Sequence, residues 1–213
     1  MKAAETIRVA QRDGSPLRLE FATPHDLNEI TDLWYNAFSP SMLPLWPDTP
    51  GVRQWWNEAN GHDMRHNPKA KYLKVVDTTQ NGRIVAYAKW SFETAKERGP
   101  RWPAWHPEMD GALMDRFLRH LETNRTTAVG DARKDFYLDM LATHTDYRKQ
   151  GAARLLLEWG CEVGDEENAH IYIDASTDGQ PVYRRFGFVS KNDPSIDAFE
   201  VAAMVRQPGW KAA

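Results

Sequence analysis

A turn between Arg148 and Ala153 carries residue types that could bind a phosphate group. Arg148, Gly151 and Ala153 follow the spacing Arg-x-x-Gly-x-Ala, and apolar residues at helical spacing come after them. The start of a helix leaves backbone N–H groups unpaired and carries partial positive charge. Glycine also lets the backbone approach a ligand closely. We therefore expect a cradle for a pyrophosphate here, with an ordinary strand-to-helix turn as the alternative.

This turn is expected to join a strand to a helix, with a second strand after them. Residues 136–143 are apolar and rich in strand-favouring types, so they predict a buried strand. The helix should begin at Gly151, because apolar residues then recur along one face. Residues 170–175 predict the second strand. Such a βαβ unit would position the cradle.

Further strands and helices are expected around this unit. Thr23-Pro24 and Thr49-Pro50 predict helix starts, because threonine caps a first turn and proline fits its first position. Asn81-Gly82 predicts a hairpin turn, and the nearly continuous apolar strand after it should be central in the sheet. The other expected segments are strands at 17–22, 71–77, 83–92 and 199–205, a flexible arm at 1–15, a single domain at 16–206, and a tail at 207–213.

Residues 93–135 form a long insertion between two of the expected strands. Trp102, Trp105 and the prolines beside them predict a rigid aromatic segment, and a helix with one apolar face follows. The insertion could cover a binding pocket or could only cap the core. The nine tryptophans of the chain, most of them before residue 106, slightly favour a pocket with aromatic walls.

The segment after the second strand completes an ordered set of motifs. Residues 182–188 read Val-Tyr-Arg-Arg-Phe-Gly-Phe and follow a strand end of small residues. Together with the Arg-x-x-Gly-x-Ala turn and the strand before it, this segment resembles the GNAT N-acetyltransferase superfamily over residues 136–189. Thr143 and Thr145 replace the usual aliphatic residue and proline, and Ala153 stands where glycine is commonest.

The resemblance implies both a fold and an activity. The fold would be α/β (α+β), of the GNAT acyl-CoA N-acyltransferase type, with a mixed central sheet flanked by helices and a helical insertion at about 93–135. The activity would be transfer of an acetyl group from acetyl-CoA, as co-substrate, to an amine of a small molecule in a ternary complex. The alternatives are acetylation of a protein amine or a hydroxyl group, and an acyl-CoA-binding sensor without transfer activity. The glycine patterns of dinucleotide and P-loop sites do not occur.

The resemblance also implies roles for individual residues. Tyr183 matches the family tyrosine that often protonates the leaving thiolate, and a phenol pKa of about 10 suits a thiol pKa of about 8.5. The strand ending at Thr143 would hold the pantetheine arm, with the N–H of Leu141 as oxyanion donor. The expected coenzyme-binding residues are Leu141, Ala142, Thr143, Arg148, Lys149, Gln150, Gly151, Ala152, Ala153, Ser176 and Tyr183.

Three side chains are candidates for the general base that deprotonates the amine. Asp139 lies within an apolar strand, where a carboxylate is costly unless it faces a wet cleft or a partner. Strict alternation would place it on the same face as Leu141. Glu93 ends the preceding strand and could act through a water, and His144 is of a type that exchanges protons near neutral pH. We rank Asp139 first, Glu93 second and His144 third, with a chain of ordered water molecules as the alternative.

Composition and charge limit the partners, cofactors and cellular location that we expect for this protein. The chain has 213 residues, a formal net charge of −3 and one cysteine, so we expect no nucleic-acid surface, no internal disulfide and a reducing compartment. No apolar run is long enough to span a membrane. His62 and His66 have no clear third ligand, so no metal ion is expected. We expect a cytoplasmic location, with the nucleus also open, and a homodimer as one option because GNAT relatives are often dimers.

Overall fold

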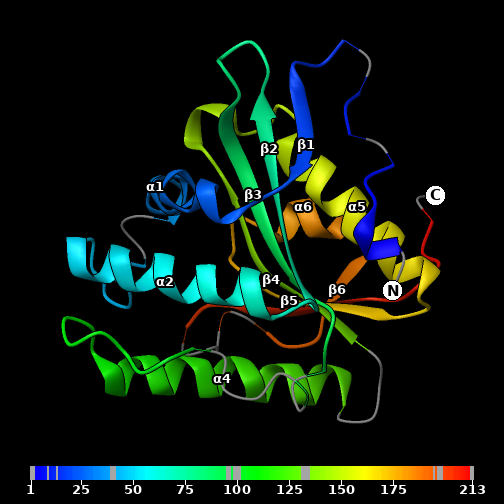
Figure 1. Cartoon of the computed structure of the whole chain (residues 1–213). Helices are drawn as coiled ribbons and strands as arrows, with labels where there is room; N and C mark the ends of the chain where they lie inside the picture. The colour runs from blue at the N-terminus through cyan, green and yellow to red at the C-terminus, as the bar shows by residue number, and fades with distance from the viewer. Residues whose placement is uncertain are drawn as a thin grey trace.

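A mixed β-sheet forms the centre of the molecule (Figure 1). The computed structural model describes residues 3–8, 10–12, 14–38, 42–94, 97, 102–130, 135–193, 195 and 199–211. Within these residues the sheet has seven strands in the order β1-β2-β3-β4-β5-β7-β6. Adjacent strands are antiparallel except β4 and β5, which are parallel. The strands are β1 (Leu17–Phe21), β2 (Ala70–Asp77), β3 (Arg83–Ser91), β4 (Asp135–Thr143), β5 (His170–Ala175), β6 (Phe188–Ser190) and β7 (Ala202–Arg206).

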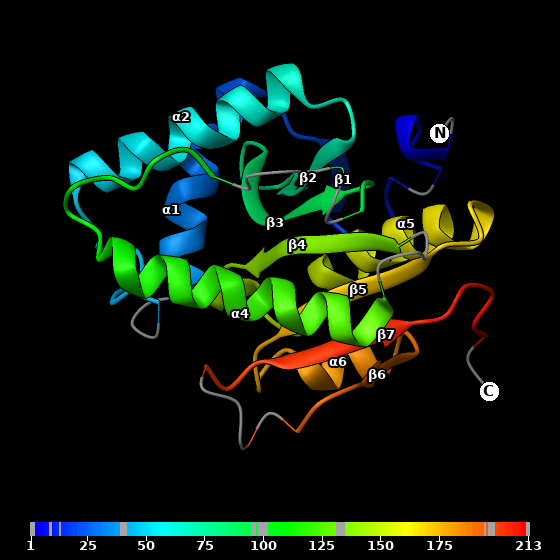
Figure 2. The same cartoon turned by 90° about the horizontal axis from the view of Figure 1, so that it is seen from below.

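Helices cover both faces of this sheet (Figures 1 and 2). On one face, α1 and α2 pack over β2, β3 and β4, while α4 lies over β5 and β7. On the opposite face α5 packs over the centre of the sheet. The described helices are α1 (Leu27–Phe38), α2 (Pro50–His66), α4 (Gly111–Val129), α5 (Ala152–Glu166) and α6 (Gln180–Arg184), with 3-10 turns at Ala3–Glu5, Pro24–Asp26 and Thr145–Tyr147.

The helix starts follow the capping signals in the sequence. The Thr49 hydroxyl accepts a hydrogen bond from the N–H of Val52 at 3.2 Å, so threonine caps α2 as predicted. Asp110 caps α4 in the same way. Thr23 and Asp26 form a reciprocal capping box, but the turn they close is a 3-10 turn that precedes α1.

Two glycines let α5 lie close to the sheet. A Cβ atom added to Gly160 would lie 2.1 Å from the ring of Trp90, and one added to Gly164 would lie 2.8 Å from Ile171. Both contacts are shorter than two carbon atoms tolerate, so larger side chains would push the helix outward. Close packing against the sheet therefore accounts for glycine in this helix interior.

Several predictions differ from the structure in detail. The strand expected at 199–205 is β7, three residues shorter at its start, and the sequence did not predict β6 or α6. The acidic residues 165–167 predict a helix end that frays into solvent, because acids oppose the helix dipole there, but Asp165 binds Arg206 at 2.7 Å. In the sequence, Ser39-Pro40 predicts the end of the first helix, because proline cannot continue a helix, and this pair lies outside the described residues.

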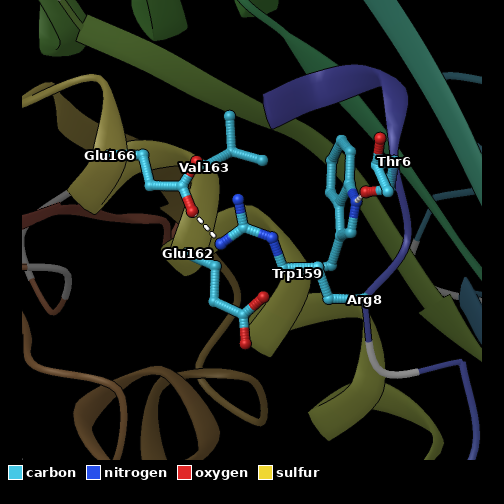
Figure 3. Close-up of a pocket in the computed structure, with 6 residues that line it drawn as sticks. All are labelled: Thr6, Arg8, Trp159, Glu162, Val163 and Glu166. Atoms are coloured by element: carbon cyan, nitrogen blue, oxygen red, sulfur yellow. Dashed lines mark hydrogen bonds and ion pairs between the residues drawn. The ribbon is translucent and has the colours of Figure 1, made fainter. Parts of the chain in front are cut away.

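The expected N-terminal arm contacts α5. The indole N–H of Trp159 donates to the carbonyl oxygen of Thr6 at 2.9 Å, and the side chains of Arg8 and Glu166 form an ion pair (Figure 3). Ala4 is buried beneath this segment. The flexibility of residues 1–15 stays a prediction.

Candidate functional site

The central strands β4 and β5 separate after a short paired stretch. Their pairing joins Asp135–Tyr137 to His170–Tyr172. Beyond these residues β4 continues along β3 and β5 continues along β7, each to its own end. We call the opening between residues 138–143 and 173–175 the split. The edges that face it carry backbone groups outside the ladder of the sheet, which an extended ligand could bind as an added strand.

The predicted phosphate cradle follows the end of β4 and is open to solvent. Gly151 has φ = +96°, and a Cβ atom there would meet nothing within 4 Å. Lys149 and Gln150 are exposed beside it. The first helical hydrogen bond runs from the N–H of Leu155 to the carbonyl of Gly151 at 3.3 Å, so the amides just before Leu155 lie outside the helical ladder. This geometry can receive an anion.

The cradle is tied to the C-terminal end of α1. The guanidinium of Arg148 donates to the carbonyl oxygen of Ala37 at 3.1 Å, and the N–H of Thr145 donates to the side-chain oxygen of Asn36 at 2.9 Å. Ala152 is buried, while Ala153 is only partly covered. These contacts fix the turn and leave its glycine uncovered.

A β-bulge interrupts β4 at Asp139. Lys89 of β3 faces Met140, and the next residue, Trp90, faces Leu138, so Asp139 has no opposite residue. An extra residue of this kind reverses the alternation of side chains beyond it.

The bulge overturns the predicted placement of Asp139. Leu141 packs against the core beneath α5, on one face of the sheet. Asp139 instead contacts Lys89, which also binds Asp63 of α2 on the opposite face. The expectation that Asp139 shares a face with Leu141 is therefore wrong, because it assumed an unbroken strand.

Asp139, Lys89 and Asp63 form a buried cluster of charges. The Nζ atom of Lys89 lies 3.4 Å from Oδ2 of Asp139 and 2.8 Å from Oδ2 of Asp63. The exposed fractions of the three side chains are 1%, 8% and 22%, in the order Asp139, Lys89, Asp63. Burial alone would raise the pKa of Asp63, but the charge of Lys89 and hydrogen bonds from Lys89 and Tyr72 outweigh it and lower that pKa.

The other two candidate bases lie elsewhere. Glu93 is buried past the end of β3, where it accepts a hydrogen bond from Asn67 at 3.0 Å. It lies two residues past Ser91, the last residue of β3. A ring nitrogen of His144 lies 2.8 Å from the guanidinium of Arg83. Glu93 is linked to Asp63 through Asn67, which binds both carboxylates.

Tyr183 and Ser176 lie on the β5 side of the split. Ser176 directly follows β5, and its hydroxyl accepts a hydrogen bond from the N–H of Gly179 at 3.3 Å. Tyr183 lies in α6, with its ring 5.8 Å from that of Phe188 and close to Gly179. Burial raises the pKa of the Tyr183 phenol above its ordinary value, so the phenol keeps its proton at neutral pH.

A small cavity lies away from the split, between the N-terminal segment and α5 (Figure 3). Its volume is about 10 Å³, which is room for about one water molecule. Thr6, Arg8 and Trp159 line it. It is too small for a coenzyme and carries no part of the candidate site.

Sequence reasoning missed the partners of Asp139. Lys89 is a lone charged residue in the apolar run of β3, and a buried charge needs a partner. That signal could have indicated Lys89. Asp63 could not be found in this way, because it lies on a mostly polar helix.

Comparison with known proteins identifies the fold. Residues 104–200 match the family model described as acetyltransferase (GNAT) domain. No curated protein matches the chain. The predicted resemblance to the GNAT superfamily and the predicted fold class are confirmed. Within the described residues, no helix combines the length and apolar character needed to cross a membrane.

Solved structures share this fold across most of the chain. A histone acetyltransferase HPA2-related acetyltransferase from Corynebacterium glutamicum has a TM-score of 0.57 and 20% identity, covering 92% of this chain and 98% of that one. The N-acetyltransferase PaiA from Thermoplasma acidophilum, in complex with coenzyme A, has a TM-score of 0.57 and 9% identity, covering 90% and 98%. The C-terminal condensation domain of Ebony, in complex with β-alanyl-dopamine, has a TM-score of 0.61 and 14% identity, covering 89% and 96%.

Proposed function

We propose that this chain, which carries a GNAT acetyltransferase domain, transfers an acetyl group from acetyl-CoA to an amine of a small molecule. The observation that carries the proposal is the split between β4 and β5, which opens beside an uncovered glycine turn. A free strand edge suits the amide-rich pantetheine arm, and a helix start suits the pyrophosphate. The coenzyme A complex of PaiA, which has the same fold, supports this use of the site.

Each part of the coenzyme has a proposed binding region. The pyrophosphate binds the backbone and basic side chains of residues 148–153, and the pantetheine arm binds the β4 edge at residues 141–143. Ser176 and Tyr183 contact the coenzyme from the β5 side. The N–H of Leu141 donates to the thioester oxygen as negative charge develops on it.

The proposed chemistry needs a base and an acid on either side of the thioester. The carboxylate of Asp139 takes a proton from the acceptor ammonium, and the neutral amine attacks the carbonyl carbon. A carbon–nitrogen bond forms, the carbon–sulfur bond breaks, and the Tyr183 phenol gives its proton to the departing thiolate. The nitrogen, positively charged after the attack, then loses its second proton, which restores the phenol of Tyr183, and Asp139 releases the first proton to solvent. The products are an N-acetyl amide and coenzyme A.

The covered acceptor side favours a small molecule over a protein. The face of the sheet that carries Asp139 lies beneath α2 and α4. The rings of Trp56 and Trp102 stack there at 5.1 Å, within a larger aromatic cluster. A protein substrate would need an open groove instead. The complex of the Ebony domain with the small amide β-alanyl-dopamine is consistent with such an acceptor.

The test is a screen of small amines with acetyl-CoA, in which free thiol is measured and the product is identified by mass spectrometry. We expect thiol release that depends on one amine class and a product 42 mass units heavier than the amine, about the mass of an acetyl group replacing a proton. Thiol release with hydroxyl acceptors alone would support ester formation instead. Coenzyme binding without release for any acceptor would support the sensor alternative.

A further inference from the structure

We propose that Lys89 is a positioning residue for acetyl transfer, whose ammonium group holds Asp139 ionised at the β4 bulge while Asp63 fixes Lys89 in place. This inference rests on the proposed function, in which Asp139 receives the proton of the acceptor amine. Neither Lys89 nor Asp63 touches the reacting atoms in this scheme, so both act through Asp139.

The position of Asp139 makes such support necessary. Asp139 is the bulge residue two positions past Tyr137, the last residue of β4 paired with β5, so it stands where the split opens. Its side chain is 1% exposed. A carboxylate removed from water takes up a proton unless a cation lies nearby, and a protonated acid cannot act as the base. Lys89 supplies that cation.

The distances from the Lys89 ammonium indicate different roles for Asp63 and Asp139. Asp63 holds the ammonium at 2.8 Å and also accepts a hydrogen bond from the Tyr72 hydroxyl at 2.9 Å. Asp139 lies farther from the ammonium, at 3.4 Å. The tighter contact therefore anchors Lys89, while the looser one stabilises the charge of Asp139 and leaves the carboxylate able to accept a proton.

The surroundings of Lys89 keep its ammonium in place. The Nζ atom lies 4.8 Å from the ring centre of Trp102 and 5.4 Å from that of Tyr72, at cation–π distance. The titratable groups in contact with it include Asp63 of α2, Tyr72 of β2 and Asp139 of β4. Glu93 joins the same network through Asn67, which binds both Asp63 and Glu93.

The first experiment measures kcat against pH for three variants. Replacing Lys89 with methionine removes the cation, so the acid limb of the profile should move up by about two pH units. Lys89→Arg keeps the positive charge, so its acid limb should stay close to the wild-type position. Lys74→Met is the matched control, because Lys74 also binds two acids, at 2.7 and 3.7 Å, on β2 away from the split. Its acid limb should not move.

Asp63→Asn gives a test of opposite sign. The variant removes a negative charge close to the Asp139 carboxylate, which favours the ionised form of Asp139, so the acid limb should move to lower pH. A purely structural defect would lower the rate in every variant and leave the limb in place. That result, or a shift in the same direction for both variants, would overturn the proposal. If Lys89→Met does not fold, the test rests on the other two variants: the acid limb should stay in place for Lys89→Arg and move to lower pH for Asp63→Asn.

A direct titration separates this inference from the proposed function. The carboxyl carbon of Asp139 can be followed by ¹³C NMR in the free protein and assigned by its loss in Asp139→Asn. We expect it to titrate at higher pH in Lys89→Met than in the wild type, and an unchanged titration would sink the inference. If no amine supports thiol release by the wild type, the proposed function fails whatever this titration gives.

Discussion

Tyr183 of α6 and Asp139 of β4 lie on opposite sides of the split, in very different surroundings. Tyr183 lies against Phe188 on the β5 side, in an apolar setting that keeps its phenol protonated. Asp139 lies on the β4 side, in a cluster that contains a cation. Apolar surroundings keep a phenol protonated, so that it can act as an acid, and a nearby cation keeps a carboxyl group ionised, so that it can act as a base.

Replacing Tyr183 with phenylalanine removes the proposed acid and keeps the ring. We expect kcat to fall about 100-fold, because general acid catalysis contributes on that order, with little change in coenzyme affinity. Steady-state kinetics and calorimetry with coenzyme A measure the two effects. Tyr35→Phe is the control, since Tyr35 binds the carbonyl of Pro47 in the helical layer. Full activity of the Tyr183 variant would remove the acid role.

For single residues, the sequence predicted which side chains are unusual better than it predicted which face of the sheet they lie on. Asp139 stands out because a carboxylate is rare in an apolar strand, and the structure gives it a charged partner. Its face could not be predicted, because a bulge is a matter of how two strands align. Lys89 and Asp63 come from distant segments that only the fold brings together.

The turn before α5 gives a prediction at the scale of one element. Gly151→Glu places a carboxylate where the pyrophosphate is proposed to bind, so coenzyme affinity should fall at least about 100-fold by charge repulsion and blocking. Calorimetry measures this. Gly14→Glu is a matched control, because Gly14 also has positive φ, at +73°, and open space around it. Unchanged affinity of the Gly151 variant would refute the cradle.

The packing of α5 on the sheet gives a second prediction. Gly160→Ala adds a methyl group 2.1 Å from Trp90. The gain in helix propensity is about 1 kcal/mol, but overpacking costs about 1–3 kcal/mol, so we expect a lower free energy of unfolding in urea. Combining it with Trp90→Phe should recover part of the loss, because the smaller ring makes room. Additive losses would show that the two residues do not press on each other.

Elements with strong local signals were predicted well. Threonine caps, the Asn81-Gly82 turn and the apolar run of β3 each determine local geometry, and β3 is an interior strand as expected. β6 and α6 are short and have little periodicity, so they carry no comparable signal. The resemblance implied a mixed sheet but gave no order of strands, because that order depends on contacts between distant segments and not on any single element.

The contact between Asp165 and Arg206 ties α5 to β7 across the molecule. Burial alone would raise the pKa of Asp165, but hydrogen bonds from Arg206 and from the N–H of Gly209 outweigh it and lower that pKa. A carboxyl group whose pKa is lower in the folded state stabilises the fold above its unfolded pKa. That contribution is lost as the pH falls through the folded pKa.

Asp165→Asn should therefore destabilise the protein most at neutral pH. The loss should be about 1–3 kcal/mol, because the nearly buried guanidinium of Arg206 loses its charged partner. The difference from wild type should shrink as the pH falls below 3.8, the ordinary carboxyl value. Urea unfolding at several pH values measures it, with exposed Asp178→Asn as control. A difference that does not change with pH would contradict this role.

The short pairing of β4 with β5 has a consequence for the whole sheet. Backbone hydrogen bonds hold β1 to β4 together as one half of the sheet and β5, β7 and β6 as the other half. The two halves are joined by the short pairing of residues 135–137 with residues 170–172. A coenzyme bound in the split would contact both halves of the sheet and link them. Binding of the coenzyme would reduce the motion of the two halves relative to each other, and its release would allow that motion again.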